Sequence, residues 1–178
     1  MLLDVDCQFI YNIYRLFSAL GRNDLAENAI EEILRTAILR EIEANAMYTA
    51  GAKRVQDASI KAMLQELALQ ELGHQHKLEA LLAGDTFKIV SHAQQQKIQD
   101  LKITDYLVPV PLAGDATLQD VLIVAGQREK GSHALYLGLA QVAEDEQAVQ
   151  LFQFLAQEEL GHKNRVETLY DEIVYSEN

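Results

Sequence analysis

Two copies of one short motif, Glu-Leu-Gly-His, are the residues in this sequence best suited to chemistry. They lie at positions 71–74 and 159–162. On a helix, residues three positions apart are neighbours, so the glutamate and the histidine of each copy point the same way. Carboxylate and imidazole ligands together suit iron or manganese. One copy would be weak evidence, whereas two matching copies indicate a shared metal site.

The two motifs belong to a longer internal repeat. Residues 36–83 align without a gap with residues 124–171, a shift of 88 positions, and 16 of the 48 aligned pairs are identical. Ordinary residue usage would give roughly three to five identities by chance. The repeat adds one more carboxylate to each copy, Glu41 in the first and Glu129 in the second, 30 residues before the glutamate of the motif. The sequence therefore predicts a duplicated unit that supplies three candidate ligands twice.

Each copy is expected to form two helices, because apolar residues recur at intervals of three and four and no segment shows sustained strand alternation. The predicted apolar faces comprise Leu34, Ala37, Ala44 and Tyr48, then Leu64, Leu67, Leu78 and Leu81, then Leu122, Ala125 and Tyr136, and finally Phe152, Leu155, Val166 and Leu169. Small polar residues that accept backbone hydrogen bonds begin helices. The predicted N-caps are Asp57, Asp145 and either Asp115 or Thr117.

The candidate ligands interrupt these apolar faces, so we expect them to point into the core. Each buried, unpaired ion costs several kcal/mol of desolvation. The adjacent cations Arg40 and Arg128 lie about 100° around the helix from the neighbouring glutamates. Protonation or pairing with cations could neutralise the carboxylates, but two divalent ions, each with one histidine, are the simplest solution. The candidate metal ligands are Glu41, Glu71, His74, Glu129, Glu159 and His162.

Two segments lie outside the repeat. Residues 5–20 are expected to form an amphipathic helix that either covers the bundle or mediates a homodimer. Residues 84–117 link the two copies, and a connection of that length is uncommon between antiparallel neighbours. It suits a crossover along the length of a bundle. We therefore predict an all-α, single-domain protein over residues 1–178: a four-helix bundle of two duplicated hairpins with one long crossover, plus an N-terminal helix.

Charge and composition exclude several other classes of protein. The 15 Lys and Arg residues stand against 27 Asp and Glu residues, a net charge of −12, so we expect no nucleic-acid partner. No apolar run reaches the ~20 residues of a membrane span, and the N-terminus lacks the features of a signal peptide. We therefore expect a cytoplasmic protein that does not enter a membrane. The single cysteine, Cys7, excludes internal disulfides and any site of four thiolates.

The sequence resembles the rubrerythrin-like branch of the ferritin-like superfamily over about residues 25–83 and 117–175. The resemblance rests on the two Glu-Leu-Gly-His strings and on Glu41 with Tyr48 and Glu129 with Tyr136. It implies a ferritin-like bundle with two iron ions (manganese at one or both positions is an alternative) that reduces peroxide or dioxygen. The two tyrosines are the candidate catalytic residues, which either hydrogen-bond the ligands or supply an electron. The alternative is that they are packed core aromatics.

The sequence departs from the rubrerythrin pattern at two points. Rubrerythrins carry a rubredoxin-like domain with four iron-binding cysteines, and one cysteine cannot replace it, so electrons would come from a separate donor protein or a small reductant. Rubrerythrins also place a carboxylate three residues after the glutamate of the third helix, where this sequence has Ser132. The neighbouring His133 is then a proton donor, a spare ligand, or a residue that supports the ligands or packs in the core.

Two other functions stay open. A di-iron oxygenase acting on an apolar substrate, similar to aldehyde-deformylating oxygenases, would have the same ligands and would need an apolar tunnel to them. A non-enzymatic iron-binding, ferroxidase or storage protein is the other alternative. Gly73 and Gly161, inside the two motifs, each cost a helix ~1 kcal/mol relative to alanine. Either close helix packing or room for an oxidant would explain them, and inheritance through the duplication would explain their symmetry.

Overall fold

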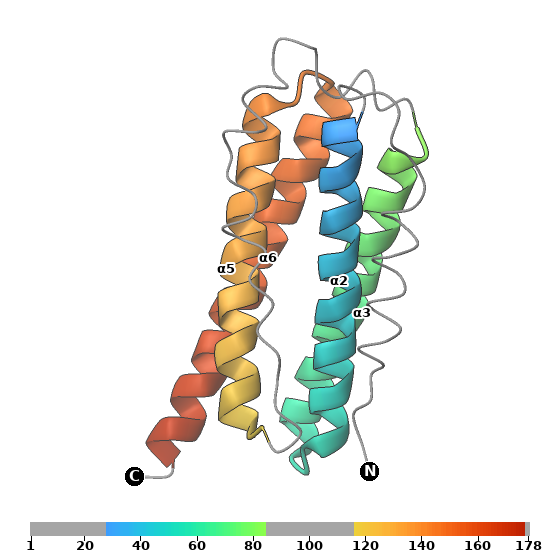
Figure 1. Cartoon of the computed structure of the whole chain (residues 1–178). Coiled ribbons are helices and arrows are strands. Elements are labelled where there is room, and N and C mark those ends of the chain that lie inside the picture. The colour runs from blue at the N-terminus through green and yellow to red at the C-terminus, as the bar shows by residue number, and fades with distance from the viewer. Residues whose placement is uncertain (1–27, 85–115, 177–178) are drawn as a thin grey trace.

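The computed structural model describes residues 28–84 and 116–176, which form four α-helices (Figure 1). They are α2 (Asn28–Arg54), α3 (Ala58–Leu82), α5 (Leu118–Val142) and α6 (Glu146–Ser176). The closest packing lies within the pairs α2–α3 and α5–α6, each of which is an antiparallel hairpin, and the two hairpins lie side by side. These described residues contain no β-strand. The predicted all-α fold of two helical hairpins is confirmed.

The end of α3 and the start of α5 lie at opposite ends of the bundle (Figure 1). This is the placement that a crossover connection between the hairpins requires. The predicted helix at residues 5–20 and nearly all of the predicted linker at 84–117 lie outside the described residues. Within the described part of the chain, no helix has the length and apolar character needed to cross a membrane.

Short polar side chains begin the helices at the predicted places. The Asp57 carboxylate accepts hydrogen bonds from two backbone N–H groups in the first turn of α3. Thr117 is the N-cap of α5, and its side chain exchanges hydrogen bonds with Asp120 in a capping box. Asp145, just before α6, accepts a backbone hydrogen bond of 2.9 Å from Ala148. These caps satisfy backbone N–H groups that the first turn of a helix leaves unpaired, and they mark where α3, α5 and α6 begin.

The predicted apolar faces form the core, which consists of two clusters with a polar layer between them. One cluster includes Leu34, Leu78, Tyr136, Phe152 and Leu155, and the other includes Tyr48, Leu64, Leu67, Leu122 and Val166. Burying a large apolar side chain stabilises a fold by about 1.5–3 kcal/mol, so the clusters supply the main stabilisation. Leu81 is the one predicted member that is only partly buried, at the edge of the first cluster.

Each hairpin has one side-chain hydrogen bond between its two helices, and the two bonds occupy equivalent positions. Asn45 Nδ2 donates to the Ala68 carbonyl at 2.6 Å, and His133 Nδ1 lies 2.7 Å from the Ala156 carbonyl. His133 lies 88 positions after Asn45, and Ala156 lies 88 positions after Ala68, which is the shift of the sequence repeat. Because a carbonyl only accepts, His133 Nδ1 carries the proton. His133 therefore has the equivalent position and the equivalent bond to those of Asn45. Its role is to hold α5 against α6, which we call its packing role.

This role can be tested by two substitutions at one position. His133→Ala should lower the free energy of unfolding of the metal-free protein by about 1 kcal/mol, because a hydrogen bond is lost. His133→Asn should restore most of that loss, because asparagine makes the same bond in the other hairpin. Urea unfolding measures both variants. Equal destabilisation by alanine and asparagine, or loss of metal binding in His133→Asn, would contradict the packing role.

Candidate metal centre

All six candidate ligands meet in the polar layer at the middle of the bundle. α2 and α5 each contribute one glutamate, and α3 and α6 each contribute a glutamate and a histidine one turn apart. Every one of these residues is at most 2% exposed: Glu41, Glu71, His74, Glu129, Glu159 and His162. The two imidazole rings stack with centroids 5.3 Å apart and planes inclined by 16°. The residues predicted from sequence therefore form one buried group.

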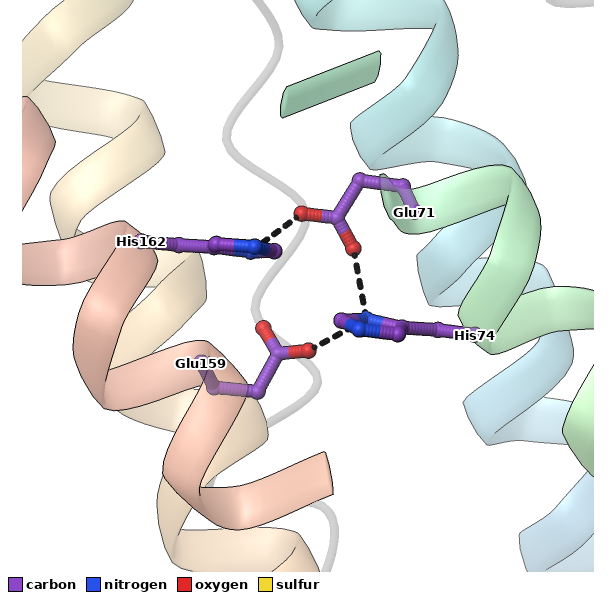
Figure 2. A group of neighbouring side chains, drawn as sticks. All are labelled: Glu71, His74, Glu159 and His162. Carbon is purple, nitrogen blue, oxygen red and sulfur yellow. Dashed lines mark ion pairs between the residues drawn. The ribbon is translucent and has the colours of Figure 1, made fainter. Parts of the chain in front are cut away.

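Glu71 lies between the two histidines (Figure 2). Its Oε1 is 2.8 Å from His162 Nδ1, and its Oε2 is 3.3 Å from His74 Nδ1. Glu159 comes from the other hairpin, with its Oε1 2.9 Å from His74 Nδ1. Ligand atoms of these four residues all lie within 4.8 Å of one another. A carboxylate whose two oxygens face two different imidazoles has the placement of a bridging ligand.

Glu41 and Glu129 lie on the outer sides of this group. Glu41 Oε2 is 3.6 Å from His74 Nδ1, and Glu129 Oε2 is 3.8 Å from His162 Nδ1. Each of these glutamates thus approaches the histidine of its own hairpin. The centre consists of two equivalent halves, one from each hairpin, with Glu71 and Glu159 between them.

Tyr48 and Tyr136 connect the two hairpins in the same layer. The Tyr48 hydroxyl donates to Glu129 Oε1, and the Tyr136 hydroxyl donates to Glu41 Oε1. Burial, followed by the nearby carboxylates, raises the pKa of both phenols well above its usual value. The hydroxyls therefore stay protonated and keep donating. Each tyrosine bonds the glutamate of the opposite hairpin, a pairing that spacing along a single helix cannot reveal.

The arginines beside the glutamates have bonds of their own. Arg128 Nη1 pairs with Glu43 Oε2 at 2.8 Å, and Arg40 Nη2 donates to the Arg128 carbonyl at 3.4 Å. Burial is the main cause of a lowered pKa of the Arg40 guanidinium. The Arg128 charge therefore balances Glu43, which lies outside the six candidate ligands.

The buried polar atoms of the centre fit a pair of divalent metal ions. Among the described residues, both carboxylate oxygens of Glu71, Oε1 of Glu159, Nδ1 of His74 and both ring nitrogens of His162 make no hydrogen bond. The short separations between these side chains are thus contacts without hydrogen-bond geometry. Unpaired buried polar atoms are costly, and metal coordination would satisfy them. Two divalent cations would also balance the four negative charges of the carboxylates.

Without metal, protons neutralise part of this charge. Burial disfavours a charged His74, but Glu41 and Glu71 outweigh burial and raise its pKa to about 9. For His162, Glu129 and Glu71 outweigh burial and raise the pKa to about 10. Burial raises the pKa of Glu41 to about 8. At neutral pH the metal-free centre therefore holds protons that incoming metal ions must displace.

Metal affinity should accordingly rise with pH from about 6.5 to about 8.5, because the imidazoles must lose protons before they can bind a metal ion. Each proton released changes the affinity by about tenfold per pH unit. Calorimetric titration of the metal-free protein with Co²⁺, in two buffers of different ionisation enthalpy, gives the number of protons released. Binding without proton release, or an affinity that falls as pH rises over this range, would contradict the protonated state of the two histidines in the metal-free centre.

Comparison with known proteins agrees with this architecture. The family model described as Rubrerythrin matches residues 32–170, so the chain belongs to the rubrerythrin family. That family and the buried Glu/His group indicate a metal site of the di-iron type. A hypothetical protein from Pyrococcus furiosus has a similar structure, with a TM-score of 0.62 and 20% identity over 85% of this chain and 94% of that chain. At that identity the likeness shows the fold. No curated protein matches the chain.

One aromatic residue beside the centre is not predicted by the apolar pattern. The Phe154 ring meets the His74 ring edge-on, with centroids 6.4 Å apart and planes inclined by 89°. Lys77 Nζ lies 5.3 Å from the centroid of the Phe154 ring. The sequence does contain one signal, because the repeat aligns Phe154 with Glu66 and so replaces a carboxylate with an aromatic ring.

The two glycines of the motifs are not explained by close helix packing. Among the described residues, a Cβ atom built on Gly161 would meet no atom within 4 Å. A Cβ on Gly73 would meet Lys77 Nζ at 3.5 Å, which is ordinary contact with a flexible side chain. Of the two physical explanations offered by the sequence, close approach is therefore wrong. Room for an oxidant stays as an explanation, and so does inheritance of the glycine through the duplication.

Proposed function

We propose that this protein is a non-haem di-iron oxidoreductase that reduces hydrogen peroxide or dioxygen with electrons from a separate donor protein. The observation that carries the proposal is the buried layer of four carboxylates and two imidazoles in two equivalent halves. Iron bound there would supply the redox change and the open positions for a small oxidant. Manganese would suit the same oxygen and nitrogen ligands at one or both positions.

The side chains in and around the layer have four tasks in this proposal. Glu71 and Glu159 hold the two halves together, and the two apolar clusters exclude bulk water, which suppresses side reactions at a redox centre. Tyr48 and Tyr136 fix the orientation of Glu129 and Glu41 through their hydroxyl groups. Each hydroxyl also keeps a proton next to a ligand oxygen, where a reduced oxidant would need one.

An oxygenase is the alternative function, and it differs from the proposed one in the kind of cavity that it needs. An oxygenase for an apolar substrate needs an apolar cavity that reaches the metal ligands. Two cavities of about 420 and 400 Å³ lie on the described part of the molecule, one between α5 and α6 and one between α3 and α6. Neither is lined by any of the six candidate ligands. A small oxidant does not require such a cavity.

Metal analysis combined with peroxide oxidation tests this function. We expect two irons per chain after loading with ferrous iron without oxygen, and rapid oxidation on adding hydrogen peroxide, followed by the rise in near-ultraviolet absorbance. The double variant Glu71→Ala, Glu159→Ala should lose the metal because both ligands between the halves are removed. Glu79→Ala, an exposed carboxylate on α3, is the matched control. An unchanged metal content in the double variant would show that the site is wrong, and loaded iron that peroxide does not oxidise would exclude the redox function.

The tyrosines provide a separate test of the mechanism. Tyr48→Phe and Tyr136→Phe should each retain both metals but slow peroxide oxidation by roughly 10-fold or more, because residues that orient ligands have effects of this size. The two variants should behave alike, since the hydroxyls occupy equivalent positions in the two halves. Stopped-flow absorbance with a metal assay on the same samples measures both quantities. Wild-type rates in both variants would identify the tyrosines as packed core aromatics.

A further inference from the structure

Two matching rows of residues line the face where α3 meets α6, and we call this face the α3–α6 seam. The rows are Glu66, Gln70, Gly73 and Lys77 on α3, and Phe154, Glu158, Gly161 and Arg165 on α6. Intervals of four, three and four place each row on one side of its helix. The two helices run antiparallel (Figure 1), so the start of one row meets the end of the other. Contacts of Arg165 with Glu66 and of Lys77 with Phe154 show this arrangement.

The middle of the α3–α6 seam has little side-chain cover over the centre. Gly73 and Gly161 occupy it, each directly before a histidine of the centre, and a side chain at Gly161 would begin in open space. On the α2–α5 side, the same layer is covered by Tyr48 and Tyr136, both fully buried. Among the described residues, this side of the layer therefore has two positions without a side chain, whereas the α2–α5 side has two buried tyrosines.

One end of the seam is closed by a fixed group of bonds. Arg165 reaches both oxygens of Glu66, through Nη1 at 3.3 Å and Nη2 at 3.0 Å. Its Nη1 also donates to Gln70 Oε1 at 3.2 Å. The planar guanidinium matches a carboxylate at two points, which gives this end directional bonds across the two helices.

The other end of the seam, at Phe154 and Lys77, is equivalent in the repeat to the Glu66–Arg165 end but has different side chains. Phe154 replaces Glu66, and Lys77 replaces Arg165. Lys77 donates to the Gly73 carbonyl at 3.3 Å and lies over the Phe154 ring, a cation–π contact worth ~0.5–1 kcal/mol at an exposed site. The ring is 44% exposed, although its edge contacts the buried His74. No directional bond holds a phenyl ring, so it can turn aside at small cost.

We propose that Phe154 is a movable cover over the His74 half of the centre and determines which molecules reach it. A neutral apolar ring admits small neutral oxidants such as hydrogen peroxide or dioxygen when it turns, and it excludes bulky organic hydroperoxides. The Arg165–Glu66 end stays closed. The inference depends on the metal centre of the proposed function, but it does not depend on redox activity.

Metal removal by a chelator tests access without any redox reaction. The protein is loaded with Co²⁺, and its loss to EDTA is followed by the visible absorbance of the bound ion. Phe154→Ala should speed removal by roughly 10-fold or more, because opening of a cover then ceases to limit the rate. The rate should also become proportional to EDTA concentration. Gly161→Leu, which fills the middle of the seam, should slow removal.

Three controls separate access from damage to the fold. Glu79→Ala, an exposed residue of α3, and Leu137→Ala, a residue of α5 that is 42% exposed, should both leave the removal rate within about twofold of wild type. Phe154→Leu retains an apolar cover and should lie between wild type and Phe154→Ala. Circular dichroism establishes that each variant is folded.

Two results would overturn the inference. One is removal from Phe154→Ala that is faster but independent of EDTA concentration, since that indicates weaker metal binding and not easier access. The other is an equal acceleration in Leu137→Ala, which would show that the loss of any exposed apolar side chain speeds removal and that Phe154 has no special role. If removal follows the expected pattern but peroxide never oxidises the ferrous protein, the cover stands and the proposed oxidoreductase function fails.

The oxidant itself supplies the second measurement. Wild-type ferrous protein should react with hydrogen peroxide much faster than with cumene hydroperoxide. In Phe154→Ala the rate with cumene hydroperoxide should rise by roughly 10-fold or more, because removing bulk from an entrance relaxes discrimination by size. The rate with hydrogen peroxide should change little. An equal increase for both oxidants would contradict the selectivity assigned to Phe154.

Discussion

The rest of this structure depends on one constraint: four carboxylates are buried in the middle of a small helical bundle. Such a group is unstable unless its charge is balanced, because each buried ion costs several kcal/mol. Without metal, protons on His74 and His162 balance part of that charge. Two divalent ions would balance all of it. The apolar core is accordingly divided into two clusters, one on each side of the layer. The clusters therefore supply the stability, and the layer between them holds the candidate metal ligands.

The layer is complete only because the hairpin is duplicated. A single hairpin supplies one glutamate on its first helix and one Glu-x-x-His pair on its second, which is half of the centre. The second hairpin supplies the other half. Glu71 of the first hairpin and Glu159 of the second lie between the two halves, and the crossed bonds of Tyr48 to Glu129 and of Tyr136 to Glu41 join them. Because the crossed bonds join opposite hairpins, they also hold the two halves of the bundle in register.

Much of this arrangement could be predicted from the sequence, since it depends on helical periodicity and on the repeat. The inward position of Glu41, the paired orientation of Glu71 and His74, and the cap at Asp57 all follow from distances along one helix. The remaining features depend on how helices approach one another. His133 on α5 bonds the Ala156 carbonyl on α6, and Phe154 on α6 contacts His74 on α3. Neither contact can be predicted from the spacing of residues along one helix, because each partner lies on a different helix.

The symmetry of the ligands has a consequence for where differences between the two halves can arise. Each half offers the same kinds of residue, two glutamates, a histidine and a tyrosine, so the candidate ligands would give two metal ions the same donors. Within the described residues, the repeat is broken at the two ends of the α3–α6 seam, where Glu66 and Arg165 correspond to Phe154 and Lys77. These side chains lie outside the ligand layer, and they differ in polarity and in how firmly they are held. A bundle built by duplication can therefore keep its metal ligands equivalent while its surroundings make one half more accessible than the other.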